Sequence, residues 1–304
     1  MPPITRSELL MKRIGRFAHF LNGVEHGDVR ALHGARVASR RLRELIPMLD
    51  LDRSTTHKLG RRLRKVTTRL GTVRELDVLL LLVDEQHVSH RDRGGGLARV
   101  GIGVSKERDQ ARKQLSSRLP IADMRRLARK LERVVAELQA TEESSSRSAS
   151  RSWRLAVEAR VSGRASRLSA AMNDAGAVYL PERLHAVRVA LKKLRYAVEL
   201  SAEVAGGTAA ADLRALKRGQ DLLGRMHDLQ VLIERVRQAQ ASLAPPNVTV
   251  WRELDALMMS LEDDCRRLHA RYVRAREALT AIADRAIAHP VVAAARTQAA
   301  RRAG

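Results

Sequence analysis

Apolar residues recur every three to four positions along almost the whole chain, with polar residues between them. This spacing places the apolar side chains on one face of a helix. The pattern predicts helices over residues 7–22, 28–49, 54–87, 97–118, 121–140, 151–172, 181–204, 209–240 and 249–287. Residues that break helices separate these segments, as at Glu25–Gly27 and Ala205–Thr208. We therefore expect an all-α protein.

Composition supports this fold class and excludes others. Aromatic residues make up only 2% of the 304 positions, too few for a typical all-β protein. No apolar run is long enough to span a membrane, and the N-terminal residues lack the apolar segment of a signal peptide. The single cysteine, Cys265, can form no internal disulfide and fits a reducing compartment. We expect a cytoplasmic protein.

Two motifs occur twice in the same order. LHGARVASRRLR at Leu32–Arg43 aligns with LHAVRVALKKLR at Leu184–Arg195, an offset of 152 residues. LGTVRELDVL at Leu70–Leu79 aligns with LGRMHDLQVL at Leu223–Leu232, an offset of 153. Two ordered blocks at nearly one spacing predict two copies of a helical unit of about 150 residues.

A polar, serine-rich segment lies between the two copies. Its sequence is TEESSSRSASRS, at Thr141–Ser152. Such a composition is typical of a linker. We expect one repeat over residues 5–140, a second over 152–290, a linker over 141–151 and a tail over 291–304.

The chain carries a large positive charge, with 57 Lys and Arg against 34 Asp and Glu and a formal net charge of +23. This excess predicts an anionic partner such as nucleic acid, an anionic membrane surface or another polyanion. Because an Arg-rich composition alone is weak evidence for an anionic partner, the placement of the charges along the helices matters more than their number.

Part of this charge forms stripes that border the apolar helix faces. At about 100° per residue, the stripe on the helix that follows Asp28 spans about 80°. The stripes contain almost no interleaved Glu or Asp, and they return in the second copy. Like charges on one helix face destabilise the folded state unless an anion neutralises them. We therefore interpret the stripes as an anion-binding site. The alternative is a solvated helix surface. Their members are His33, Arg36, Arg40, Arg43, Lys58, Arg62, Lys65 and Arg69 in the first copy, and His185, Arg188, Lys192, Arg195, Arg214, Lys217 and Arg218 in the second.

The paired signatures L-H-x-x-R-V-A-x-[RK]-[RK]-L-R and L-G-x-x-x-[ED]-L-x-V-L resemble those of the CHAD family, the histidine-containing α-helical domain. The resemblance implies two four-helix bundles related by pseudo-twofold symmetry, with a basic cavity or groove between them that binds inorganic polyphosphate. The E-x-E-x-K signature of a fused triphosphate-tunnel domain is absent from the sequence. One departure is the acidic pair of the second motif, which is Glu75 and Asp77 in the first copy but Asp228 and Gln230 in the second.

Other residues of these motifs have expected structural roles. Carboxylates are poor ligands for a polyanion, so we expect Glu75, Asp77 and Asp228 to pair with Arg on a neighbouring helix. Gly71 and Gly224 lie within predicted helices, where close approach of another helix would explain them. The two motif histidines can donate to phosphate, which should raise their pKa. Tyr196 can either donate its hydroxyl or pack in the core.

Competing sites are weaker. His227–Asp228 matches the dipeptide of metal phosphohydrolases, and His87 and His90 share the end of a helix, but no set of metal ligands at suitable spacing accompanies them. Gly94–Gly96 lacks the Lys-Ser/Thr that follows a phosphate-binding loop and indicates a flexible turn. No nucleophile motif is present. We expect no metal, no cofactor and no catalytic residues.

The sequence therefore predicts non-catalytic binding of inorganic polyphosphate, with recruitment to polyphosphate granules or regulation of polyphosphate metabolism as the cellular role. The alternative is a helical protein that binds nucleic acid without sequence specificity, although basic and aromatic residues do not interleave as in a base-stacking surface. A hydrolase would need carboxylates that hold a metal at the basic site, and the stripes contain none.

Overall fold

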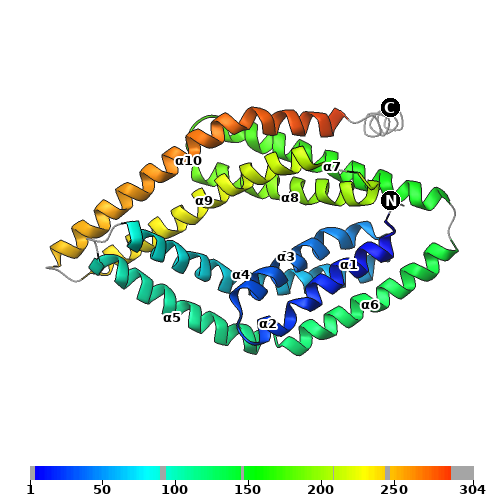
Figure 1. Cartoon of the computed structure of the whole chain (residues 1–304), viewed down its shortest axis with the longest axis horizontal. Coiled ribbons are helices and arrows are strands. Elements are labelled where there is room, and N and C mark those ends of the chain that lie inside the picture. The colour runs from blue at the N-terminus through cyan, green and yellow to red at the C-terminus, as the bar shows by residue number, and fades with distance from the viewer. Residues whose placement is uncertain (1–3, 90–93, 145–146, 208, 244–246, 289–304) are drawn as a thin grey trace. The chain divides into compact units, whose positions relative to one another are not determined.

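A computed structural model describes residues 4–89, 94–144, 147–207, 209–243 and 247–288. Throughout these ranges the ordered elements are helices, as the sequence predicts, and no strand occurs in them (Figure 1). The elements are α1 (Arg6–His19), α2 (Leu21–Glu25), α3 (Val29–Leu45), the 3₁₀ turn η1 (Ile46–Met48), α4 (Arg53–Ser89), α5 (Gly94–Arg118), α6 (Ile121–Glu143), α7 (Arg147–Ala175), α8 (Pro181–Ala205), α9 (Ala210–Ala241) and α10 (Val248–Ala288). None of the described helices is long and apolar enough to cross a membrane. The predicted tail lies outside the described residues.

The chain divides into two compact units. Unit 1 consists of residues 1–9, 137–225 and 267–304, and unit 2 consists of residues 10–136 and 226–266. The unit boundaries fall inside α1, α6, α9 and α10. In unit 2, α3 packs against α4 and α4 packs against α5, whereas α7 packs against α8 in unit 1. The helices of the first stripes, α3 and α4, thus belong to unit 2, and those of the second, α8 and the start of α9, belong to unit 1.

Local signals set the helix ends close to the predicted positions. Asp28 caps α3, because its side chain accepts a hydrogen bond from the Ala31 N–H at 2.7 Å. Pro181 occupies the first turn of α8, where its missing N–H costs nothing. Gly206 ends α8 with a φ of 66°, a left-handed conformation that glycine adopts without strain. Because capping residues mark these helix ends in the sequence itself, the predicted bounds of both motif helices lie within a few residues of the observed bounds.

The first predicted helix, 7–22, is wrong in one respect, because helix α1 ends at His19 and Phe20 lies between it and the next helix. There the Phe20 N–H bonds to the Phe17 carbonyl, and the short helix α2 follows. The ring of Phe20 packs onto α3 at Gly34, where a Cβ in place of the glycine hydrogen would stand 2.5–2.6 Å from three ring atoms. The break therefore depends on a contact with α3 that periodicity within residues 7–22 does not contain.

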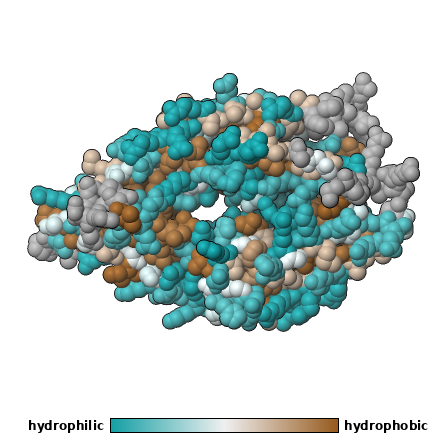
Figure 2. Space-filling view, in the orientation of Figure 1, coloured by the Kyte–Doolittle hydropathy of each residue, from teal (hydrophilic) through white to brown (hydrophobic). Residues whose placement is uncertain are grey.

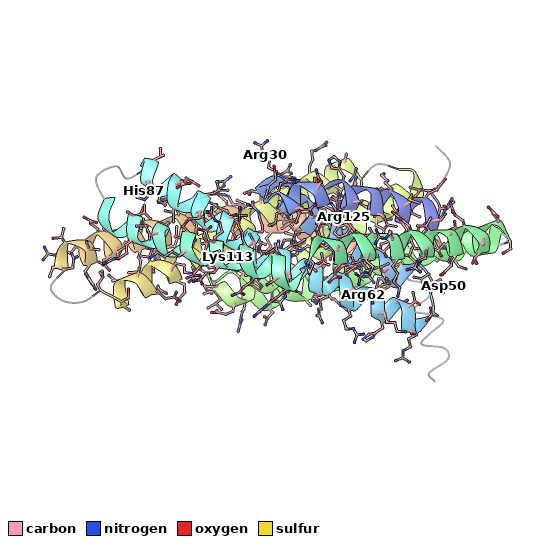
Figure 3. The ribbon with its side chains drawn as sticks, turned by 90° about the horizontal axis from the view of Figure 1, so that it is seen from below. Arg30, Asp50, Arg62, His87, Lys113 and Arg125 are labelled. Carbon is pink, nitrogen blue, oxygen red and sulfur yellow. The ribbon has the colours of Figure 1, made fainter. Side chains whose placement is uncertain are left out.

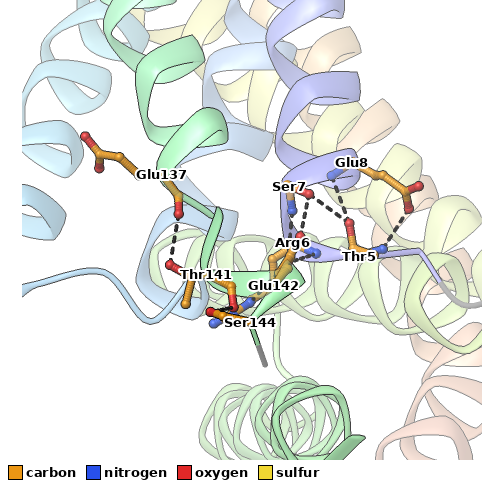
Figure 4. Close-up of polar contacts among 8 residues, drawn as sticks. All are labelled: Thr5, Arg6, Ser7, Glu8, Glu137, Thr141, Glu142 and Ser144. Carbon is orange, nitrogen blue, oxygen red and sulfur yellow. Dashed lines mark hydrogen bonds and ion pairs between the residues drawn. The ribbon is translucent and has the colours of Figure 1, made fainter. Parts of the chain in front are cut away.

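The serine-rich joint is shorter than the expected linker over 141–151. α6 continues to Glu143 and α7 begins at Arg147, while residues 145–146 lie outside the described ranges. Glu142 explains the extension of α6, because its carboxylate accepts hydrogen bonds from the backbone N–H groups of Arg6 and Ser7 and from the Ser7 hydroxyl (Figure 4). A carboxylate at the N-terminus of α1 also faces the positive end of that helix.

Leucine dominates the core of each unit. In unit 2 the side chains of Leu42, Leu63 and Leu70 are fully buried, as are Leu168 and Leu191 in unit 1. Burying one leucine stabilises a fold by about 1.5–3 kcal/mol. The single cysteine, Cys265, belongs to the core of unit 2 at 1% exposure, with its sulfur 3.9 Å from the Met226 carbonyl oxygen. Hydrophilic residues cover most of the face in view (Figure 2).

Candidate functional site: basic stripes on two helix pairs

The first stripe on α3 borders the buried face of that helix. Its apolar neighbours Leu32, Ala35, Ala38, Leu42, Leu45, Ile46 and Leu49 are all buried, which confirms the predicted core face. His33 is exposed, whereas Arg36, Arg40 and Arg43 are half-buried. The half-buried arginines bury their aliphatic parts along the core margin, as long cationic side chains commonly do.

Arg36 is held between α3 and α4. Its Nη2 donates to Oε1 of Glu75 at 3.1 Å, and its side chain is only 15% exposed. A Cβ at position 71 would stand 3.2 Å from Nε of Arg36, so Gly71 leaves space for the guanidinium. The expected pairing of Glu75 with Arg on a neighbouring helix is confirmed, and the group that approaches Gly71 is this side chain.

The stripe on α4 is more accessible than the stripe on α3. Lys58, Arg62 and Lys65 are exposed, Arg69 is half-buried, and the side chains of this end of α4 project from the ribbon near the labelled Arg62 (Figure 3). Leu59, Leu63, Val66 and Leu70 beside them are buried. Throughout the described ranges, no carboxylate lies within ion-pair distance of Arg62, Lys65 or Arg69. Three cations on one helix face therefore stand without a neutralising carboxylate among those residues.

The second copy repeats the α3 stripe on α8. His185 is exposed, and Arg188, Lys192 and Arg195 are half-buried. Arg195 is held by two hydrogen bonds, because its Nε donates to Oε1 of Gln220 at 2.9 Å and its Nη1 donates to Oε1 of Glu199. Its guanidinium carbon also lies 4.9 Å from the ring centre of Tyr196. Tyr196 itself is 9% exposed, which favours the packing role over phosphate contact.

The α9 stripe is thinner. Arg214, Lys217 and Arg218 are all exposed on the part of α9 that belongs to unit 1. Lys217 pairs with Asp221 at 2.6 Å, one helical turn away. Arg214 and Arg218 have no carboxylate within ion-pair distance among the described residues.

The remaining motif residues divide between confirmed and wrong expectations. Asp77 is 4% exposed and lies 3.5 Å from Nη2 of Arg112 on α5, which confirms its pairing with Arg. Gly224 is surrounded by open space, because a Cβ added there would meet no atom within 4 Å, so the expected close helix approach is wrong at this position. Asp228 and Gln230 are half-buried on α9.

Partial burial and neighbouring cations hold the pKa of both motif histidines below the ordinary value. For His33, burial is the largest cause, followed by the positive charges of Arg74, Arg36 and Arg40. For His185, burial again comes first, and Arg188 and Lys192 add to it. Arg74 was missed by the sequence reasoning, although it stands in the second motif directly before Glu75.

Competing sites gain no support. No group of three potential metal ligands occurs among the described residues, and His90 lies outside them. Gly94–Gly96 is not the expected turn, because α5 begins at Gly94 and the Gly96 N–H donates to Oε2 of Glu253 at 3.1 Å. A Cβ at position 96 would stand 2.8 Å from Leu254, so this glycine allows α5 to approach α10.

Comparison with known proteins places this geometry in a family. The family model described as the CHAD domain matches residues 8–237. The crystal structure of the CHAD domain from the plant Ricinus communis superposes with a TM-score of 0.57 at 24% identity, over 87% of this chain and 89% of that one. PptA from Streptomyces chartreusis superposes with a TM-score of 0.62 at 18% identity, over 90% and 98% of the two chains. No curated protein sequence matches. Because the family model covers most of the sequence, the chain belongs to the CHAD domain family.

Proposed function

We propose that this protein binds inorganic polyphosphate through its basic stripes and does not transform it. The observation that carries the proposal is the α4 stripe, where Arg62, Lys65 and Arg69 have no carboxylate within ion-pair distance among the described residues. A polyanion would supply the missing negative charge. The family resemblance supports polyphosphate as that polyanion.

The chemistry of the stripes suits a flexible chain of phosphates. Guanidinium groups bind two phosphate oxygens at once, whereas Lys acts as a point charge. Cations at i, i+3 and i+7 along α4 offer successive contacts to one chain. Binding of this kind releases counterions, so the affinity should fall steeply as salt rises. Recruitment to polyphosphate granules and regulation of polyphosphate metabolism are cellular roles consistent with such binding.

The decisive experiment compares ligands at matched phosphate concentration and near-physiological salt. Long-chain polyphosphate, a short DNA duplex and tripolyphosphate are each titrated into the protein, and free phosphate is assayed afterwards. We expect long-chain polyphosphate to bind most tightly and no phosphate to be released. Tighter binding of DNA would replace the proposal with a nucleic-acid-binding function, and phosphate release would indicate a hydrolase.

A matched pair of variants tests the stripe itself. Arg62→Ala with Lys65→Ala removes two exposed charges from α4, and Arg129→Ala with Arg133→Ala removes two exposed charges from α6. The α4 variant should lose at least about tenfold in polyphosphate affinity, since one charged hydrogen bond contributes about 1.5–3 kcal/mol. Equal losses in the two variants would mean that binding depends on net charge and not on the stripe.

A further inference from the structure

The N-terminal part of α10 exposes large apolar side chains. Val248 is 54% exposed, Trp251 47% and Met259 62%, and all three belong to unit 2. The other tryptophan of the chain, Trp153, is 7% exposed. Single exposed apolar residues are common on proteins, but a half-exposed tryptophan with methionine on the same helix is typical of a protein-binding surface. This part of α10 is therefore a candidate interaction surface.

The apolar side chains share one side of α10 with charged residues. At about 100° per residue, the positions from Trp251 round to Arg252 span about 100° of the helix. Leu254, Leu257 and Leu261 are buried and lie on a different side. We call the exposed set the α10 face; its members are Val248, Trp251, Arg252, Asp255, Met259 and Glu262.

The helices that flank the α10 face hold its margins without covering it. α9 runs beside α10 (Figure 1), and Nη2 of Arg237 on α9 donates to Oε1 of Glu262 at 3.0 Å. Nε2 of Gln240 on α9 donates to the Trp251 carbonyl at 3.3 Å. On another side of α10, the carboxylate of Glu253 accepts a hydrogen bond from the first turn of α5. These contacts fix the position of the helix and leave the apolar side chains of the face exposed.

The charge around this face differs from that of the rest of the chain. Residues 226–266, the second segment of unit 2, contain seven Asp and Glu against four Arg, in a chain with a net charge of +23. An acidic segment disfavours a polyanion or an anionic membrane surface, so the face is suited to a protein. Two copies of a chain with this positive charge repel each other. The repulsion is smallest where acidic residues offset the positive charge, which is at this segment.

The α10 face is complementary to itself. Among the described residues, no carboxylate lies within ion-pair distance of the exposed Arg252. Arg252 and Glu262 are about 15 Å apart along the helix axis, at 1.5 Å per residue. If two copies of α10 pack antiparallel about a twofold axis midway between these residues, Arg252 of each copy lies opposite Glu262 of the other. Trp251 then comes within one helical turn of Met259 of the second copy.

We infer that two copies of the chain associate through the α10 face as an antiparallel, twofold-symmetric helix pair. The exposed apolar residues and the complementary charges at the two ends of the face carry this inference. The stretch from Val248 to Glu262 is about 22 Å long, so the contact is smaller than a standard interface of about 1,600 Å² and the dimer should be weak and reversible. The inference goes beyond the proposed function, because no stripe residue belongs to this face.

Sedimentation equilibrium of the whole chain from about 1 μM to about 1 mM measures the association. The mass should rise from one copy to two and no further, because a twofold contact is closed. Trp251→Ala should weaken the dimer at least about tenfold, since aromatic anchors dominate such contacts. The matched control is Ile102→Ala on α5, which removes a side chain that is 59% exposed and outside the face, and it should change nothing. One copy at every concentration, or equal weakening by both variants, overturns the inference.

Charge exchange tests the antiparallel pairing directly. Arg252→Glu places two carboxylates opposite each other at both ends of the pair, and Glu262→Arg places two cations there. Each variant alone should associate at least about tenfold more weakly than the unmodified chain. An equimolar mixture of the two variants should regain the dimer, because opposite charges then face each other again. Thermal unfolding shows that each variant is folded, and a mixture of folded variants that stays monomeric overturns this pairing.

The α4 variant (Arg62→Ala with Lys65→Ala) separates this dimer from a head-to-tail contact. A contact between the acidic segment of one copy and the basic stripes of another is open, so it grows beyond two copies and weakens when stripe charges are removed. Either result overturns the inference, whereas an unchanged dimer in the α4 variant supports it. Trp251→Ala should bind long-chain polyphosphate as tightly as the unmodified chain does. A failure of the dimer and a failure of polyphosphate binding are therefore distinguishable.

Discussion

Nη2 of Arg36 on α3 lies 3.1 Å from Oε1 of Glu75 on α4, and the two partners differ sharply in exposure, at 15% and 71%. The guanidinium is held at the margin of the core, while the carboxylate remains in water. An anion that binds the α3 stripe must therefore compete with Glu75 for Arg36.

Glu75→Gln should strengthen polyphosphate binding about two- to fivefold, because an exposed ion pair contributes only about 0–1 kcal/mol to positioning while the lost charge no longer repels the ligand. Glutamine can still accept a hydrogen bond from Arg36. The gain should shrink as salt is raised. Weaker binding in this variant would show that Glu75 acts mainly by orienting Arg36.

Replacing the two motif glycines by alanine should have unequal effects. Gly224→Ala should raise the free energy of unfolding by about 0.5–1 kcal/mol, because alanine favours a helix and a new Cβ meets nothing within 4 Å. Gly71→Ala should gain less, since its Cβ would lie 3.2 Å from Arg36 Nε. Urea unfolding measures both, and equal gains would contradict the crowding at Gly71.

Arg36→Ala combined with Arg188→Ala should weaken polyphosphate binding without unfolding the protein. Glu75, the carboxylate that pairs with Arg36, is exposed, so its charge is not stranded in the core when Arg36 is removed. Titration of the double variant with polyphosphate measures its affinity, and thermal unfolding of the same variant measures its stability. A large fall in the melting temperature would show that the arginines serve the fold more than the ligand.

Unfolding should become easier as the pH falls below about 6.5. Because burial and nearby cations lower the pKa of His33 and His185 from 6.5, the unfolded chain takes up protons before the folded one does. The contribution of the neutral histidines to stability is therefore complete above pH 6.5 and is lost as the pH falls towards their folded pKa. His33→Asn with His185→Asn should flatten the dependence of urea midpoints on pH.

Polyphosphate binding should have the opposite dependence on pH. A bound anion favours the charged imidazole, so the pKa of His33 and His185 should rise and binding should take up protons near pH 6. Calorimetry at that pH in two buffers with different ionisation enthalpies measures the uptake. Identical heats in both buffers would mean that neither histidine lies close to the ligand.

The helices and stripes were predictable because both depend on local sequence. The predicted segment 181–204 became Pro181–Ala205, since a proline and a glycine mark its ends. The break at Phe20 was not predictable, because it arises from contact with Gly34 on another helix.

Cys265 is 1% exposed in the core of unit 2, so the reactivity of its thiol reports how often the helices of that unit separate. A thiol reagent can reach this sulfur only when the surrounding helices separate, so the labelling rate of the unmodified protein measures how often they do. Since no second cysteine is present, the signal has one source. A ligand that stabilises unit 2 would slow the reaction without a dye or tag, and one bound elsewhere would leave the rate unchanged.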